Sequence, residues 1–234
     1  MSDTIYALSS GALPAAIGII RISGPAAGSA LASLAGGLPP ERMPVVRKLR
    51  DHEGDTLDVA LVLWFPGRRT ATGEDLVELH CHGGRAVVAA VLNALAAIPG
   101  LREAEPGEFT RRAFLNGRVD LAEAEGLGDL LSAETELQRR GAMQAAGGAV
   151  SRRIDEWRSR ILGFAAAVEA VIDFADEDDV AGLPPGLTDE TEDLVAEIRR
   201  VAGRPEAERL RDGVRVILAG PPNAGKSSLF NALL

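Results

Sequence analysis

The chain has 234 residues, 46% of them hydrophobic and 25% charged, a composition typical of a soluble globular protein with about two domains. Its net charge of −9 argues against a broadly basic, nucleic-acid-binding surface. A single cysteine excludes an internal disulfide framework, and because no signal peptide or membrane-spanning apolar run is present, we expect a cytoplasmic protein without membrane association.

Residues 1–118 alternate strand and helix patterns, which predicts one compact α/β or α+β domain. The predicted strands are Thr4–Leu8, Ala16–Ile22, Leu57–Phe65 and Asp75–His82, and the predicted helices are Ala26–Leu34 and Arg85–Ile98. The prolines between residues 39 and 44 predict a loop. Residues 106–125 predict a helix, a turn at Asn116–Gly117 and a second helix, and the simplest interpretation is an αα corner with its arginines in solvent.

From about residue 119 the pattern becomes helical, and residues 119–210 are predicted to form an all-α domain. Asp120 can cap its first helix, whose regularly spaced apolar residues lie between Leu121 and Leu131. Apolar residues three or four apart predict an amphipathic helix over Ile154–Ile172, and Leu187–Val201 predicts another. For the acidic run Asp173–Asp179 we favour a solvated loop over a metal site.

Residues 211–234 predict the strand, loop and helix that begin a nucleotide-binding domain. Val214–Ala219 is a continuous apolar run, Gly220–Ser227 matches G-x-x-x-x-G-K-S, and Ser228–Leu234 predicts a helix. The glycines let backbone N–H groups face a phosphate, Lys226 adds a positive charge, and Ser227 offers a hydroxyl to Mg²⁺. Lys226 is one of only two lysines in an arginine-rich chain.

The rest of a GTPase domain does not follow in these 234 residues. We therefore expect a fragment of a longer protein, without a catalytic residue of its own and without GTPase activity when taken alone. A strand and a helix with no sheet to join should also pack poorly.

Two charged residues interrupt apolar strands in the front domain, Arg21 and Glu78. Each either faces solvent or requires a partner or ligand, because an unpaired buried charge is very costly. Strand alternation places Glu78, His80 and His82 on one face and Cys81 on the other. Such a Glu/His/His set could hold a metal, but we favour no metal there, and we interpret Cys81 as a small core residue.

Seven segments together resemble the MnmE (TrmE) family of tRNA-modification GTPases, in register over the whole chain. They are RISG (21–24), LWFPG (63–67), TGED (72–75), ELHCHGG (78–84), PGEFTRRAFLNGRVDLAEAE (106–125), IDFADED (172–178) and GPPNAGKSSLFNALL (220–234). The resemblance implies a tetrahydrofolate-binding-like domain at residues 1–118, a helical domain at 119–210 and the start of a GTPase domain at 211–234.

What the resemblance implies about function is specific. Members of the family form homodimers and, with the flavoprotein MnmG in a heterotetramer, add a folate-derived one-carbon group to C5 of the wobble uridine in certain tRNAs. GTP, Mg²⁺, K⁺ and a tetrahydrofolate derivative, 5-formyl- or 5,10-methylene-tetrahydrofolate, are the implied ligands. The helix Arg85–Ile98, apolar nearly all round, adds to the expectation of a homodimer.

The family's binding residues map onto this sequence position by position. The folate residues correspond to Arg21, Glu78 and Arg118, where the family usually has lysine at the third position. The GTP-binding residues correspond to Asn223, Ala224, Gly225, Lys226, Ser227 and Ser228, with Asn223 as a K⁺ ligand and Ser227 as a Mg²⁺ ligand. The alternative is a non-catalytic dimerisation or docking module of another small GTPase, in which Arg21, Glu78 and Arg118 form ordinary ion pairs.

Overall fold

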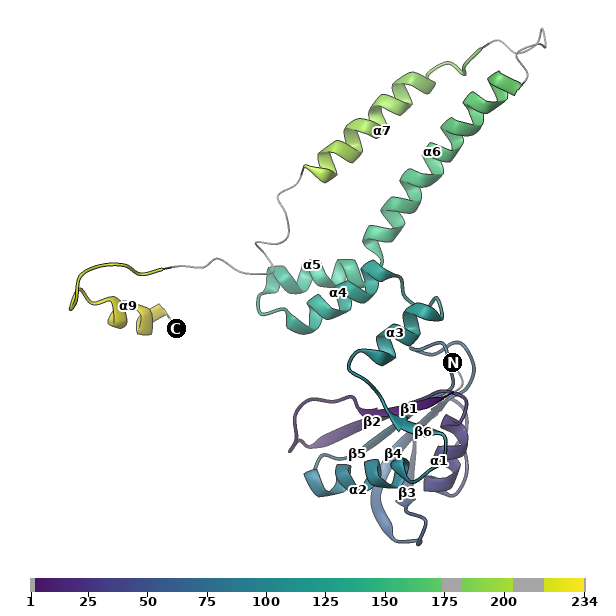
Figure 1. Cartoon of the computed structure of the whole chain (residues 1–234), viewed down its shortest axis with the longest axis vertical. Helices are drawn as coiled ribbons and strands as arrows, with labels where there is room; N and C mark the ends of the chain where they lie inside the picture. The colour runs from purple at the N-terminus through teal and green to yellow at the C-terminus, as the bar shows by residue number, and fades with distance from the viewer. Residues whose placement is uncertain (1–2, 174–181, 204–216, 234) are drawn as a thin grey trace. The chain divides into compact units, whose positions relative to one another are not determined.

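The computed structural model describes residues 3–173, 182–203 and 217–233 (Figure 1). Its contacts separate an N-terminal unit, Met1–Ala124, from a C-terminal unit, Glu125–Leu234. The described strands are β1 (Thr4–Leu8), β2 (Ile17–Ser23), β3 (Val45–Arg50), β4 (Thr56–Phe65), β5 (Leu76–His82) and β6 (Leu101–Glu103). They form one sheet in the order β3-β4-β5-β2-β1-β6, in which β1 and β6 are parallel and all other neighbours are antiparallel.

One face of this sheet holds the hydrophobic core. Alternate strand residues such as Ile20, Val62 and Leu79 are fully buried in one cluster with α1 (Ala27–Ala35) and α2 (Arg85–Ala96). Leu31 and Val91 bring the two helices into the same cluster. Burial of this apolar surface is what fixes the strand register, since a shift of one residue would turn the core side chains to the other face.

The other face of the sheet is here called the open face. Strand alternation and register place on it Ile17, Ile19, Arg21, Val46, Val59, Leu61, Glu78 and His80. Its hydrophobic side chains are unusually accessible: Ile17 is 55%, Val46 62% and Val59 47% exposed. An apolar sheet surface of this kind is characteristic of an interaction site.

The sequence suggests that the wide apolar surface of α2 contributes to a dimer, but the structure packs that surface within the N-terminal unit. Val88, Val91 and Leu95 are buried in the core cluster. Val87 and Leu92, which lie on the flanks of that face, are partly buried against the same cluster. The wide apolar surface of α2 therefore serves its own unit, and the exposed apolar residues of the sheet lie on the open face instead.

The C-terminal unit is helical in its described part. Its helices are α4 (Leu121–Ser132, which begins in the N-terminal unit), α5 (Glu136–Ala146), α6 (Ala149–Asp173), α7 (Leu187–Ala202) and α9 (Lys226–Leu233). Helix α5 begins with a capping box between Thr135 and Gln138. Gly126 lets α4 approach α5 closely, because a Cβ atom there would lie 2.4 Å from the backbone nitrogen of Ala146.

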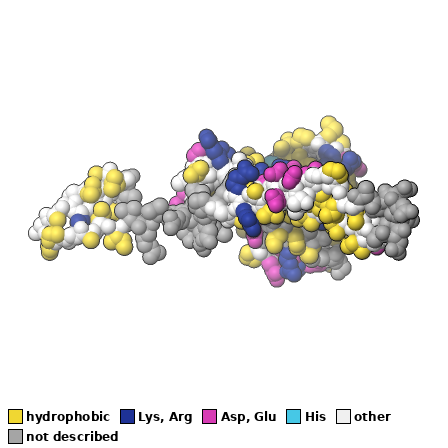
Figure 2. All heavy atoms as spheres, turned by 90° about the horizontal axis from the view of Figure 1, so that it is seen from above, with side chains coloured by type: hydrophobic (Ala, Val, Ile, Leu, Met, Phe, Trp, Pro, Cys, Tyr) yellow, Lys and Arg dark blue, Asp and Glu magenta, His cyan; other side chains and the backbone are white. Residues whose placement is uncertain are grey.

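Helices α6 and α7 run side by side in opposite directions (Figure 1). Glu197 of α7 accepts hydrogen bonds from Trp157 Nε1 at 2.9 Å and Arg160 Nη1 at 3.0 Å. Ile161, which is 50% exposed, lines an apolar groove between the two helices. Figure 2 shows small groups of basic and acidic side chains with hydrophobic side chains beside them on the face drawn. None of the described helices is both long and apolar enough to cross a membrane.

The predicted fold class, a mixed α/β domain followed by helices, is confirmed. Three elements, β3, β6 and α5, are absent from the sequence prediction. The predicted strand Val214–Ala219 is wrong in its described part, since residues 217–219 pair with no neighbouring strand and have no regular structure. Residues 214–216, like most of the acidic run Asp173–Asp179, lie outside the described residues.

Candidate functional site

Arg21 and Glu78 lie opposite each other on the open face. They are cross-strand partners in the antiparallel register of β2 and β5. Arg21 Nε donates a hydrogen bond to Glu78 Oε1 at 2.9 Å, and the two side chains are 41% and 17% exposed. Neither residue is simply a solvated strand position, because the sheet brings the two charges together at its centre.

His80 completes this group on the same face of β5. Its Nε2 lies 3.2 Å from Glu78 Oε2, and its side chain is 24% exposed. Since an ionised carboxylate only accepts hydrogen bonds, the proton of this contact belongs to the imidazole. Each oxygen of Glu78 thus has one partner within the protein and retains capacity to accept a further hydrogen bond from a ligand.

Arg118 occupies a separate part of the N-terminal unit. It follows helix α3 (Glu108–Leu115) and is exposed, and its Nε donates to the carbonyl oxygen of Thr70 at 3.0 Å. Gly73 makes room for it, because a Cβ atom there would lie 3.0 Å from Arg118 Cγ. The structure therefore pairs two of the three predicted folate residues, Arg21 and Glu78, and holds the third against the 70–74 loop.

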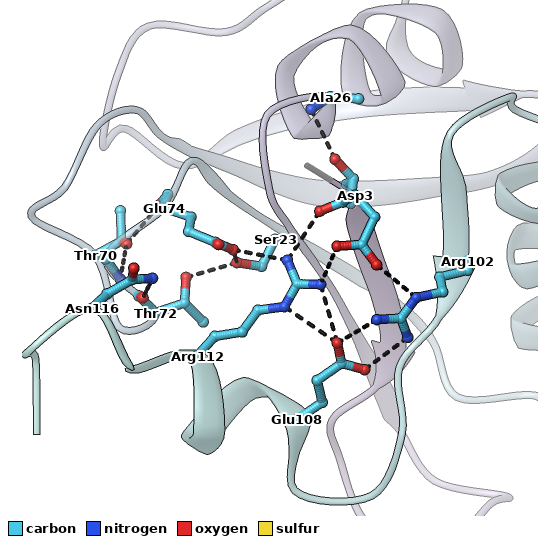
Figure 3. Close-up of polar contacts among 12 residues, drawn as sticks. Asp3, Ser23, Ala26, Thr70, Thr72, Glu74, Arg102, Glu108, Arg112 and Asn116 are labelled. Carbon is cyan, nitrogen blue, oxygen red and sulfur yellow. Dashed lines mark hydrogen bonds and ion pairs between the residues drawn. The ribbon is translucent and has the colours of Figure 1, made fainter. Parts of the chain in front are cut away.

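The most extensive polar cluster in the described chain surrounds Arg112, whose side chain is completely buried (Figure 3). Its guanidinium donates to Asp3 Oδ1 at 3.0 Å, Glu74 Oε2 at 3.1 Å and Glu108 Oε1 at 3.0 Å, and to the Asp3 carbonyl at 3.0 Å. Arg102 forms ion pairs with the same Asp3 and Glu108. The prediction of solvated arginines in this region is therefore wrong for Arg112.

The same cluster organises the 70–74 loop. Ser23 of β2 lies 2.7 Å from the hydroxyl of Thr72 and donates to Glu74. Asn116 Nδ2 donates to the carbonyl of Thr72 at 2.7 Å. The spacing of Glu108, Arg112 and Asn116, four residues apart, places them on one face of a helix, and this sequence signal could have identified the cluster.

A second carboxylate–histidine contact lies at the end of β5. His82 Nδ1 is 2.7 Å from Asp58 Oδ1, and the His82 backbone N–H donates to Asp58 Oδ2 at 2.8 Å. The Asp58 side chain is 7% exposed, whereas that of His82 is 73% exposed. Burial alone would raise the pKa of Asp58, but the His82 side chain and the backbone N–H groups of His82 and Val59 hold it below its usual range.

Two features limit the chemistry of this strand. Burial raises the pKa of the Cys81 thiol to about 12, so Cys81 is a neutral core group rather than a nucleophile. Within the described ranges, no group of three His, Cys, Asp or Glu side chains is arranged to hold a metal ion. In the described structure Glu78, His80 and His82 of β5 therefore have hydrogen-bonding partners but form no common metal site.

The glycine-rich loop precedes α9, which begins at Lys226. Asn223 and Gly225 have positive φ angles of 62° and 79°, which curl the backbone. Lys226 Nζ donates to the carbonyls of Gly220 at 2.9 Å and Pro221 at 2.7 Å. The lysine thus lies across the loop, and Ser227 stands in the first turn of the helix. Backbone N–H groups there favour an anion, and the Ser227 hydroxyl can bind the metal ion that accompanies it.

Comparison with known families covers nearly the whole chain. The family described as the GTP-binding protein TrmE N-terminus matches residues 4–118, and the family described as the MnmE helical domain matches residues 121–228. The first match contains the open face and the Arg112 cluster except Asp3, and the second contains the described helices α4 to α7.

Three relatives, each named tRNA modification GTPase MnmE, illustrate the similarity. The protein of Erythrobacter litoralis is 62% identical over 232 residues, covering 99% of this chain and 55% of the relative. That of Novosphingobium aromaticivorans is 59% identical over 244 residues (100% and 56%), and that of Rhizorhabdus wittichii is 60% identical over 235 residues (99% and 53%). The chain spans about half the length of the curated relatives that it matches.

Proposed function

Because this chain belongs to the MnmE (TrmE) family, we propose that it acts as part of a GTP-binding protein of tRNA modification. In this proposal it works with a flavoprotein partner, MnmG, to add a folate-derived one-carbon group to C5 of the wobble uridine. GTP hydrolysis in the complete protein drives a conformational change. The family assignment removes the alternative, a docking module of some other small GTPase.

The observation that carries the folate part of the proposal is the Arg21–Glu78 pair. Its carboxylate is anchored on one oxygen by Arg21 and on the other by His80, and it lies on an accessible apolar sheet face. A pterin ring presents a ring N–H beside an exocyclic amine, two parallel donors that suit a carboxylate. We assign Glu78 to that edge, and Arg21 and Arg118 to the oxygen-rich parts of the ligand.

The loop around Lys226 supports the GTP part of the proposal. We assign the backbone of Asn223–Gly225, together with Lys226, Ser227 and Ser228, to the phosphates. Ser227 would hold Mg²⁺ and Asn223 K⁺, both through oxygen atoms, which these hard cations prefer. Lys226 already lies against two carbonyl oxygens and needs only to exchange them for phosphate oxygens. We further propose that these 234 residues alone do not hydrolyse GTP.

We also propose that the N-terminal unit forms a homodimer through the open face. Ile17, Val46 and Val59 supply the exposed apolar area there, and isologous pairing of a sheet face is a common way to bury it. The folate site would then lie beside the dimer interface, which would exclude water from the Arg21–Glu78 pair.

Calorimetric titration of 5-formyltetrahydrofolate into the wild type and Glu78→Ala tests the folate site. Loss of one charged partner in a desolvated site costs about 2–4 kcal/mol, so affinity should fall about 30- to 1000-fold. Glu53→Ala is the matched control, since Glu53 has a 72% exposed side chain in a loop of the same unit. Equal affinity of wild type and Glu78→Ala, with both folded, would refute the assignment.

A further inference from the structure

The pair formed by Asp58 and His82 has no role in the function proposed above. The chain contains three histidines, and His82 is the one whose Nδ1 contacts a nearly buried carboxylate. His52 differs sharply, since its Nε2 lies 3.9 Å from the carboxylate of the exposed Glu53. His80 contacts Glu78 through Nε2. Because His82 contacts Asp58 through Nδ1, its other ring nitrogen, Nε2, is directed away from that carboxylate.

The geometry of this pair fixes one tautomer. Both oxygens of Asp58 accept backbone N–H groups, from His82 at 2.8 Å and from Val59 at 2.8 Å, so the carboxylate is held in one orientation. An ionised, oriented carboxylate 2.7 Å from Nδ1 requires the hydrogen on Nδ1. Nε2 is then the group available for proton exchange, and the 73% exposed ring offers it to a ligand.

We propose that Asp58 and His82 form a general acid–base dyad at the end of β5, with His82 Nε2 as the proton donor to a reduced folate. The inference rests on the folate function proposed above. Glu78 and His82 share one face of β5 four residues apart, which separates their Cα atoms by about 13 Å. A folate whose pyrimidine edge is bound by Glu78 and whose long axis follows β5 directs its N5–N10 region toward His82.

The proton step concerns the opening of a 5,10-methylene bridge. The bond between the methylene carbon and N10 breaks, and its electron pair remains on N10. The His82 imidazolium transfers its Nε2 proton to N10 and becomes neutral, while the N5 lone pair forms an iminium with the methylene carbon. Asp58 is the positioning residue, since it holds the ring in the orientation that presents Nε2 to N10.

Nuclear magnetic resonance of the ¹⁵N-labelled histidines tests the dyad without any ligand. We expect His82 in the Nδ1–H tautomer and a mixture of tautomers at His52, which serves as the internal reference. Asp58→Asn should abolish the preference of His82 and leave His52 unchanged. A His82 that resembles His52 in the wild type would overturn the dyad.

Trapping of the ring-opened species tests the chemistry. The full chain is mixed with 5,10-methylenetetrahydrofolate and cyanoborohydride, which reduces the N5 iminium to 5-methyltetrahydrofolate. Formation of this product should slow on the order of 100-fold in His82→Gln, by a smaller factor in Asp58→Asn, and not at all in His52→Gln. Gln at position 82 can still donate to Asp58, so this variant should fold.

Affinity for 5-formyltetrahydrofolate, measured on the same variants, distinguishes failure of the dyad from failure of the proposed folate function. We expect His82→Gln to bind this folate as the wild type does, because it loses proton transfer and not recognition. If His82→Gln binds the folate and forms the trapped product at the wild-type rate, the dyad is overturned and the proposed folate function stands. A wild type that binds no folate would overturn the proposed function, and the ligand of the dyad with it.

Discussion

Arg112 is a fully buried cation surrounded by three carboxylates from three different segments of the chain. Asp3 precedes β1, Glu74 ends the 70–74 loop and Glu108 begins α3. Burial opposes the charge of Arg112, but its hydrogen bonds to Glu108 and Glu74 raise its pKa above the usual value. The arginine therefore stays ionised and joins the three carboxylates in one cluster.

Arg112→Ala should lower the free energy of unfolding of the N-terminal unit by about 3–5 kcal/mol, because it removes the ion-pair partner of the largely buried Glu74 and leaves Asp3 and Glu108 with Arg102 alone. Urea denaturation followed by circular dichroism measures the effect. Arg111→Ala is the matched control, since the adjacent Arg111 is exposed and should change stability by less than about 0.5 kcal/mol. Equal stability of the two variants would contradict a structural role for the cluster.

Glu108 gives the cluster a defined response to pH. Its hydrogen bond from Arg102, opposed by burial and assisted by the Glu105 N–H and by Arg112, lowers its pKa to about 2. A carboxyl whose pKa is lower in the folded state stabilises the fold above its ordinary pKa of 4.5. We expect the free energy of unfolding to fall on the order of 2–3 kcal/mol as pH drops from about 4.5 to about 2.

Glu108→Gln should be less stable at pH 7 and should flatten this dependence, as measured by urea denaturation at a series of pH values. Glu105→Gln is the control, because the Glu105 side chain is exposed and should leave the slope unchanged. A Glu108→Gln protein with the wild-type slope would show that another carboxyl governs acid unfolding.

The sequence identified some site residues and not others, for physical reasons. Arg21 and Glu78 stand out because a charge inside an apolar strand is conspicuous, although only the register of β2 and β5 shows that they are partners. Asp58 also interrupts an apolar strand, and Arg112 lies at helical spacing from Glu108, but neither pattern shows that these charges are buried, because their burial depends on long-range packing. The contact between Asp3 and Arg112 spans a sequence separation of 109 residues, which no local pattern encodes.

Among the secondary structure elements, predictability follows local signals. β1 is predicted at its observed bounds and α2 at its observed start, because apolar periodicity and flanking glycines or prolines mark them. β3 (VVRKLR) is charged and mostly exposed, and β6 has only three residues, so each becomes a strand through pairing with a neighbour rather than through its own pattern.

Helix α4 offers a test of close helix packing. Gly126→Ala should destabilise the contact of α4 with α5, because the added Cβ would lie 2.4 Å from the backbone nitrogen of Ala146, which cannot move as a flexible side chain can. Gly128→Ala on the same helix is the control. A Cβ there meets nothing within 4 Å, and helix propensity predicts a gain of up to about 1 kcal/mol.

Thermal unfolding by circular dichroism should place Gly126→Ala below and Gly128→Ala above the wild type. If both substitutions raised the melting temperature, the close approach of α4 to α5 would not exist in solution.

At the scale of the whole molecule, the open face predicts the oligomeric state. Val59→Glu places a charge among the exposed apolar side chains and should convert a dimer into a monomer in sedimentation velocity, with a weaker dimer expected for Val46→Glu. Leu131→Glu is the control, since Leu131 is 91% exposed and belongs to the C-terminal unit. A wild type that remains monomeric at high concentration would contradict the proposed dimer.

The pairing of β1 with β6 also has a consequence for synthesis on the ribosome. Thr4 pairs with Leu101, so one edge of β1 stays unpaired until about 100 further residues have been translated. At 5–20 residues per second this interval is on the order of 5–20 s. Throughout it, the nascent chain exposes an unpaired strand edge, the kind of surface that associates with other chains. Slow codons before residue 101 would lengthen that exposure, and chaperones that bind nascent chains would shield it.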